Sequence, residues 1–126
     1  MEALKYAHAL QVFHQDMKPD NVFMMTDGSV KLGDFGIAKC LASTDQNKDA
    51  KGTGGTLYYM PPEIWRGERA NYTGDIWAVG CILREMITGE IAFKYKTEEQ
   101  IRKAVLKDCL PRLPKCYSRE LRAMVW

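Results

Sequence analysis

Two short polar segments carry the side chains that could bind a metal ion and act on a phosphate. Residues 14–21 read His-Gln-Asp-Met-Lys-Pro-Asp-Asn, and residues 34–36 read Asp-Phe-Gly. Mg²⁺ takes oxygen ligands and keeps several waters, so one carboxylate and one amide are a typical protein contribution. Asn21 and Asp34 could supply these two oxygens. The pair would therefore suit a magnesium-bound triphosphate.

A helix and a short strand are predicted before the first segment. Residues 2–10 carry apolar side chains at helical spacing, and Val12–Phe13 is a brief apolar run that leads into residue 14. The region 39–56 is polar and glycine-rich and has no periodicity, which predicts a loop. The first polar segment would thus begin where a strand ends.

A hairpin is predicted between the two candidate ligands. Residues 22–25 and 30–32 are apolar runs, and Asp27-Gly28 between them favours a tight turn with positive φ. Asn21 precedes the first strand and Asp34 follows the second. A tight turn would therefore determine how far apart the two side chains lie.

The second half of the chain predicts helices. Pro61-Pro62 can open a short helix, because proline suits a first turn. Residues 75–88 are apolar on nearly every side, which predicts a helix in the middle of the core. Residues 97–107 are amphipathic, with acidic side chains early and lysines late, as the helix dipole favours. A final helix is expected at 118–126.

The two polar segments resemble the catalytic and magnesium-binding loops of protein kinases. Residues 60–63 (Met-Pro-Pro-Glu) resemble the Ala-Pro-Glu end of the activation segment, with proline in place of alanine. Residues 74–80 (Gly-Asp-Ile-Trp-Ala-Val-Gly) are similar to the start of the buried core helix. The order and spacing of these motifs follow the family. Residues 31–39 and the Gly-Thr-x-Tyr-Tyr-x-x-Pro-Glu run further resemble the NIMA-related Ser/Thr kinases.

The resemblance implies an α+β, mainly helical fold, namely an incomplete protein-kinase C-terminal lobe without the N-terminal lobe and the final helices. Residues 1–126 would be a partial kinase domain, with the catalytic loop at 14–21, the magnesium loop at 34–36, the activation segment at 34–63 and the buried core helix at about 74–88. The chain has no counterpart of the family's Gly-rich loop, strand lysine and helix glutamate. We therefore expect it to be a fragment.

The resemblance assigns catalysis to Asp16 and Lys18, with ATP and Mg²⁺ as cofactors. Asp16 would orient the incoming hydroxyl and accept its proton late, and Lys18 would contact the transferred phosphate. Asn21 and Asp34 would hold the metal and, with Lys18, the nucleotide. Phe23 would form the floor beneath adenine or pack in the core. Without the resemblance, Asp16 could simply cap a turn and Lys18 could be a solvated surface residue.

Other residues of these loops would support the site. The ring of His14 should pack below Phe35 of the Asp-Phe-Gly motif, which ends at Gly36, and His14 is not expected to do acid–base work. Gln15 stands where the family usually has an arginine that pairs with a phosphorylated activation loop. Glutamine brings no charge. Activation-loop phosphorylation should therefore matter less here.

Four further residues carry structural or regulatory expectations. Thr56 matches the family threonine that hydrogen-bonds the catalytic Asp and Lys, and Thr53 is a candidate phosphosite. Asp75 should accept hydrogen bonds from the catalytic-loop backbone, because an unpaired carboxylate in so apolar a helix would be costly. Glu63 resembles a buried glutamate whose arginine partner lies beyond the sequence, so it should be left buried and unpaired.

The composition is that of an ordinary single domain. The chain has 126 residues, is 46% hydrophobic and 27% charged, and carries a formal net charge of +2. So small a charge gives no reason to expect nucleic acid or a membrane surface as a partner. No signal peptide or membrane span is visible, and the four cysteines lack paired spacing. We expect an intracellular, cytoplasmic protein with reduced thiols, while its oligomeric state stays open.

These features lead to one main functional hypothesis. The chain would represent a Ser/Thr kinase that transfers the γ-phosphate of ATP to a protein hydroxyl, and alone it should be inactive. A pseudokinase or scaffold that binds a partner is the first alternative, favoured by Gln15. A non-functional truncated gene product is the second. Small-molecule phosphotransferases share the Asp-x-x-x-x-Asn loop but lack the later motifs.

Overall fold

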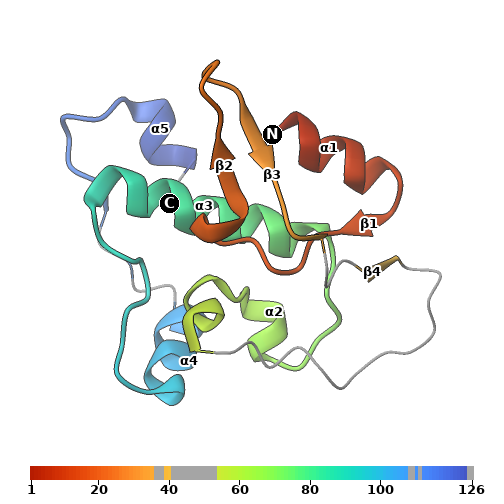
Figure 1. Cartoon of the computed structure of the whole chain (residues 1–126). Helices are drawn as coiled ribbons and strands as arrows, with labels where there is room; N and C mark the ends of the chain where they lie inside the picture. Colours follow the sequence, from red (N-terminus) through yellow and green to blue (C-terminus); the bar gives the residue numbers. More distant parts are fainter. Residues whose placement is uncertain (36–38, 41–53, 108–109, 111, 125–126) are drawn as a thin grey trace.

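The computed structural model describes residues 1–35, 39–40, 54–107, 110 and 112–124. A long helix, α3 (Tyr72–Thr88), runs across the middle of the molecule (Figure 1). The hairpin and α1 lie on one side of it, and α2 and α4 lie on the other (Figure 1). The elements before α3 are α1 (Glu2–Ala9), β1 (Val12–Phe13), the 3-10 helix η1 (Pro19–Asn21), β2 (Val22–Met24), β3 (Val30–Leu32), β4 (Lys39–Cys40), the 3-10 helix η3 (Gly54–Tyr59) and α2 (Pro62–Trp65), and those after it are α4 (Glu98–Lys107) and α5 (Arg119–Met124).

Local signals define both ends of α3. The side chain of Asn71 accepts a hydrogen bond from the backbone N–H of Thr73, which caps the first turn. Gly89 ends the helix in a left-handed conformation, with φ of 73°. The helix therefore begins two residues before the predicted 74, because its cap lies outside the apolar run.

Helix α3 lies in the middle of the molecule, as predicted, but its burial is incomplete (Figure 1). Cys81 is fully buried and Ile82 nearly so, whereas Ile76 is 42% and Met86 is 72% exposed. Neighbouring elements cover one broad face of the helix, and among the described residues nothing covers the other. Apolar composition alone cannot show which face a partner covers.

The hydrophobic core joins the two sides of the molecule. Phe93 is fully buried, and its ring stacks on Trp77 at a centroid distance of 5.7 Å. Complete burial of such a side chain contributes about 1.5–3 kcal/mol. The buried residues of this cluster are Leu4, Met17, Tyr59, Trp65, Ala78, Cys81, Ile82, Phe93, Ile101, Ala104 and Val105.

The predicted hairpin is confirmed. Strands β2 and β3 pair antiparallel, with Val22 opposite Leu32. Gly28 adopts φ of 80° in the turn, where a side chain would be strained. The backbone N–H of Met25 donates to the carbonyl of Ser29 and closes the hairpin.

The loop predicted for residues 39–56 is wrong at both of its ends. Lys39–Cys40 forms β4, which pairs antiparallel with β1. Gly54–Tyr59 forms the 3-10 helix η3. Both features depend on contacts with distant parts of the chain, such as Val12 opposite Cys40, and so have no local periodicity.

The remaining helices follow the sequence pattern. Helix α2 has proline in its first turn, and α4 carries its acidic residues early and Lys107 late. Glu99 and Lys103 form an ion pair of 2.7 Å along the exposed side of α4. In the part of the chain that the structure describes, no helix is long and apolar enough to cross a membrane.

Candidate active site

Residues 14–21 bring an acid, a base and an amide together between β1 and β2. The Lys18 Nζ atom donates to Asp16 Oδ2 at 2.9 Å, and Asn21 Nδ2 donates to the Asp16 carbonyl at 2.8 Å. Asp16 is only 6% exposed. The hydrogen bond between Lys18 and Asp16 is the main cause that raises the pKa of Lys18. Lys18 therefore stays cationic.

The two carboxylate oxygens of Asp16 differ in their surroundings. Asp16 Oδ1 is buried and has no hydrogen-bond partner among the described residues. A buried oxygen without a partner is unfavourable unless a ligand completes the site. One oxygen of this carboxylate is thus anchored by Lys18, and the other can accept a hydrogen bond.

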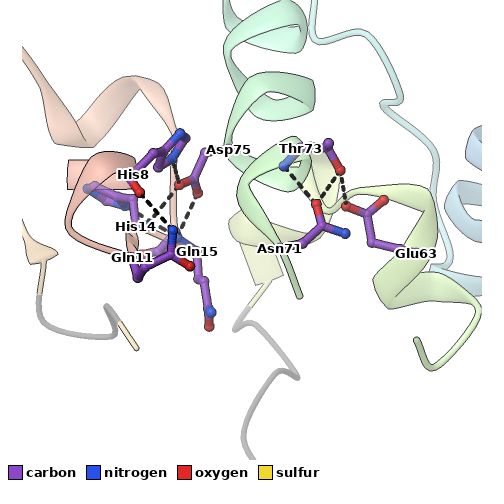
Figure 2. A network of polar contacts seen from close by, with 9 residues as sticks. His8, Gln11, His14, Gln15, Glu63, Asn71, Thr73 and Asp75 are labelled. Atoms are coloured by element: carbon purple, nitrogen blue, oxygen red, sulfur yellow. Dashed lines mark hydrogen bonds and ion pairs between the residues drawn. The ribbon is translucent and has the colours of Figure 1, made fainter. Parts of the chain in front are cut away.

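The backbone before Asp16 is held in an unusual conformation. Gln15 adopts φ of 63°, which costs a residue with a side chain about 1–2 kcal/mol. Asp75, 2% exposed, accepts from the backbone N–H of His14 through Oδ2 and from that of Gln15 through Oδ1, both at 2.9 Å (Figure 2). The hydrogen bonds expected of Asp75 are therefore present.

His14 connects the two polar segments. Its Nε2 donates to the Gly33 carbonyl at 2.9 Å, because a carbonyl can only accept. Its Nδ1 accepts from the backbone N–H of Asp16 at 3.3 Å. The ring lies against Phe35 at a centroid distance of 4.6 Å, as predicted. Both ring nitrogens are occupied, which agrees with a structural role.

Asn21 and Asp34 lie at the two ends of the hairpin. Asn21 is buried, and its backbone carbonyl accepts from the N–H of Gly33 at 2.9 Å, one residue before Asp34. Asp34 is exposed and adopts φ of 55°. The Nδ2 atom of Asn21 is engaged by Asp16. Its amide oxygen and the Asp34 carboxylate are hard oxygen donors and fit Mg²⁺ by their chemistry.

The structure adds a limit to the metal prediction. Among the described residues, no group of three or more His, Cys, Asp or Glu could hold a metal ion. Mg²⁺ needs no such group, because waters and phosphate oxygens complete its shell. The carboxylate–amide pair therefore stays a prediction.

Phe23 does not pack in the core, so that half of its prediction is wrong. Its side chain is 50% exposed. It lies over Gly33, where an added Cβ would come within 2.5 Å of Phe23 Cε2. Met24 and Val30 of the same hairpin are also exposed, at 77% and 57%. The hairpin thus presents an open apolar face.

The expectation for Glu63 is wrong. Its side chain is half-buried, and Oε1 accepts from the Thr73 hydroxyl at 3.3 Å, as the right-hand side of Figure 2 shows. The Asn71 side-chain oxygen also lies within hydrogen-bond reach of this hydroxyl, so Glu63 and Asn71 share its single proton. Glu63 therefore has a neutral partner at the start of α3 and is not an unpaired buried charge.

Three predicted residues cannot be placed in the site. Gly36 and Thr53 lie outside the described residues. Thr56 belongs to η3, but the contacts of its side chain are outside the description. The side chain of Gln15 is half-buried and points away from Asp75 in Figure 2.

Two contacts of the site were not predicted. His8 Nε2 lies 2.7 Å from Asp75 Oδ2, and Tyr59 donates to Glu85 Oε2 at 2.6 Å. Burial and the Glu85 carboxylate raise the pKa of the Tyr59 phenol. The partners are 67 and 26 residues apart, so no spacing rule would have found them.

Comparison with known proteins agrees with this arrangement. The family model of the protein kinase domain matches residues 1–123. Mouse serine/threonine-protein kinase Nek4 is 38% identical over 124 residues, which are 98% of this chain and 15% of the relative. The G2-specific protein kinase nim-1 of Neurospora crassa is 40% identical over 116 residues, 92% of this chain and 13% of the relative.

A plant kinase matches as well. AtPK1/AtPK6 of Arabidopsis thaliana is 37% identical over 125 residues, 99% of this chain and 26% of the relative. The chain therefore spans between 13% and 26% of the length of these three relatives. Nek4 and nim-1 confirm the resemblance to NIMA-related Ser/Thr kinases. Since the family model covers almost every residue, the chain belongs to the protein kinase domain family.

Proposed function

We propose that this chain is part of a Ser/Thr protein kinase that transfers the γ-phosphate of ATP to a hydroxyl of a protein. The observation that carries the proposal is the asymmetric carboxylate of Asp16, with Oδ2 anchored by Lys18 and Oδ1 buried without a partner among the described residues. A substrate hydroxyl could donate to Oδ1. Asp16 would orient this hydroxyl and accept its proton late, because the transition state of phosphoryl transfer is loose.

Lys18 and the hairpin ends would bind the phosphates. The cationic Nζ of Lys18, held beside Asp16, would stabilise charge on the transferred group. Asn21 and Asp34 would hold Mg²⁺, whose charge would offset that of the phosphates when it is bound. The exposed ring of Phe23 offers an apolar surface for adenine.

We infer that residues 1–126 supply a C-terminal lobe, with the catalytic loop at 14–21, the magnesium loop at 34–36, the activation segment at 34–63 and the core helix at about 74–88. The open apolar face of the hairpin supports this assignment, because a second lobe could cover it. A protein substrate and ATP are the proposed partners. The cysteine spacing supports an intracellular, cytoplasmic location.

The experiment compares two carboxylate variants in the full-length protein. Asp16→Ala and Asp34→Ala should each abolish phosphate transfer to a basic protein substrate. Only Asp34→Ala should markedly weaken Mg²⁺-dependent ATP binding, measured by calorimetry. Glu98→Ala, which removes an exposed carboxylate from α4, is the control and should change neither quantity.

Two results would contradict the proposal. Equal losses of ATP affinity in both variants would refute the division of roles. Binding of ATP without any transfer by the wild-type protein would favour a pseudokinase, the alternative that Gln15 supports through its missing charge.

A further inference from the structure

Gly74 lies in the first turn of α3, where this helix passes close to the end of the proposed activation segment. Glycine weakens a helix relative to alanine, because it loses more backbone freedom on folding. Gly74 has helical backbone angles and does not use the positive φ that glycine allows. The backbone conformation therefore gives no reason for a glycine at this position.

The space around Gly74 does give a reason. A Cβ added at this residue would lie 3.1 Å from Pro61 Cγ, 3.7 Å from Pro61 Cβ and 3.3 Å from Glu63 Oε1. Carbon atoms in good contact lie about 3.5–4.0 Å apart, so the approach to Pro61 Cγ is too close. The proline ring would have to move by a few tenths of an ångström to admit any side chain.

The two neighbours differ in how easily they can move. Figure 2 shows the side chain of Glu63 reaching toward the start of α3, and its Oε1 is the end of a flexible chain that can turn away. Pro61 is held at both sides, because its ring fixes φ at −76° and its carbonyl accepts from the N–H groups of Ile64 and Trp65. A side chain at position 74 would therefore push Pro61, the N-cap of α2, away from α3.

The segment that ends at Pro61 also packs beside the candidate active site. Tyr59, two residues earlier, belongs to the same cluster of buried side chains as Met17, which directly follows Asp16. A protein substrate must lie next to Asp16 to place its hydroxyl on Oδ1. A displacement of Pro61 would thus change the surface that such a substrate meets, while the hairpin with the proposed nucleotide groups would keep its place.

We propose that Gly74 is a positioning residue for the protein substrate: without a side chain, it lets Pro61 pack against α3 and so keeps the end of the activation segment in place beside Asp16. Pro61 stands where the family motif has alanine, so a larger ring meets α3 at this point. The inference rests on the proposed function, because it assigns Gly74 a role in that reaction. The effect of Gly74 passes through Pro61.

The test is a double-mutant cycle in the full-length protein, with Gly74→Ala, Pro61→Ala and both together. Pro61→Ala removes the ring carbon that a Cβ at position 74 would meet at 3.1 Å. Tyr72→Phe, in the same turn of α3 at a 57% exposed position, is the matched control. The measurements are kcat/KM for a basic protein substrate, KM for ATP and the melting temperature.

We expect Gly74→Ala to lower kcat/KM for the protein substrate by about tenfold, because small misplacements of reacting groups are costly. KM for ATP should change less than about twofold, since uniform binding of the nucleotide is retained. Adding Pro61→Ala should bring kcat/KM back to within about threefold of the wild type, because residues in contact are not additive. Tyr72→Phe should match the wild type.

The melting temperature should show the same coupling as a change of sign. Gly74→Ala should lower it in the wild-type background, where the new Cβ meets the proline ring. In the Pro61→Ala background the same substitution should raise it, because alanine is the better helix former once the space is free.

The inference is overturned if Gly74→Ala keeps full activity, or if it lowers kcat/KM equally with and without Pro61→Ala. If Gly74→Ala alone does not fold, a folded and active double variant supports the inference, and an unfolded or inactive one overturns it. Absence of transfer by the wild-type protein would instead refute the proposed function. The melting temperatures would then still show whether Gly74 and Pro61 are coupled.

Discussion

Replacing Asp75 by alanine is the most informative test of how the fold supports the site. The substitution removes the acceptor of three hydrogen bonds, from His8, His14 and Gln15. The His14 amide is in a buried environment and cannot regain its bond from water. The cost is therefore that of groups left without partners, which is larger than the net contribution of an ordinary hydrogen bond.

The magnitude follows from the burial of each donor. A buried group without a partner costs about 1–3 kcal/mol, and bonds to a charged acceptor lie at the upper end. Full cost for His14 and partial costs for Gln15 and His8, whose environments are partly exposed, give about 3–5 kcal/mol in total. Whole domains have a free energy of unfolding of about 5–15 kcal/mol, so the loss is a large share.

The assay is urea unfolding of the chain, followed by the fluorescence of its three tryptophans. With a slope of about 2 kcal/mol per molar urea, Asp75→Ala should lower the midpoint by about 2 M. Asp75→Asn keeps one acceptor oxygen and should lower it by about half as much. Met86→Ala, at a 72% exposed position on the same helix, should cost less than about 0.5 kcal/mol.

A midpoint shift below about 0.5 M for Asp75→Ala, with an unchanged slope, would refute this reasoning. It would mean that water or a rearranged loop satisfies His14 and Gln15 without Asp75. If the wild-type chain is itself only marginally stable, the variant should be unfolded without urea. Far-UV circular dichroism would show this directly.

Three further predictions concern activity and titration. The 126-residue chain alone should transfer no phosphate in a radiolabel assay, because it has no counterpart of the family's Gly-rich loop and strand lysine. Phosphate transfer that is lost in the Asp16→Asn variant would contradict this prediction. Burial raises the pKa of the Cys81 thiol to about 12, so at pH 8 iodoacetamide should label the exposed Cys116 but not Cys81, as mass spectrometry would show. Burial and Glu85 raise the pKa of Tyr59, so the folded state keeps a proton that the unfolded state releases above about pH 10. Stability should fall as the pH rises beyond that value, and an equal fall in Tyr59→Phe would contradict the assignment.

Local chemistry explains what could be predicted from the sequence. The turn at Asp27-Gly28 and the apolar run of α3 are signals that lie within the segments themselves. The hairpin and α3 were therefore predicted in type and nearly in extent. The polar segments around Asp16 and Asp34 were found because their spacing along the chain is itself the signal.

Tertiary structure decided which faces are covered and which distant residues meet. Ile76 and Phe23 have large apolar side chains like those of core residues, yet both are exposed. Burial depends on whether another element packs against the side chain, and not on the side chain alone. The pairing of β1 with β4 joins segments without local periodicity.

The contacts that shape the candidate site were also decided by tertiary structure. His8 meets Asp75 across 67 residues, and Glu63 is given a partner by Thr73 at the start of another helix. Such hydrogen bonds depend on the mutual placement of α1, α2 and α3. The sequence by itself determined which groups could do the chemistry, whereas only the packing of the helices determined how the backbone beside Asp16 is held.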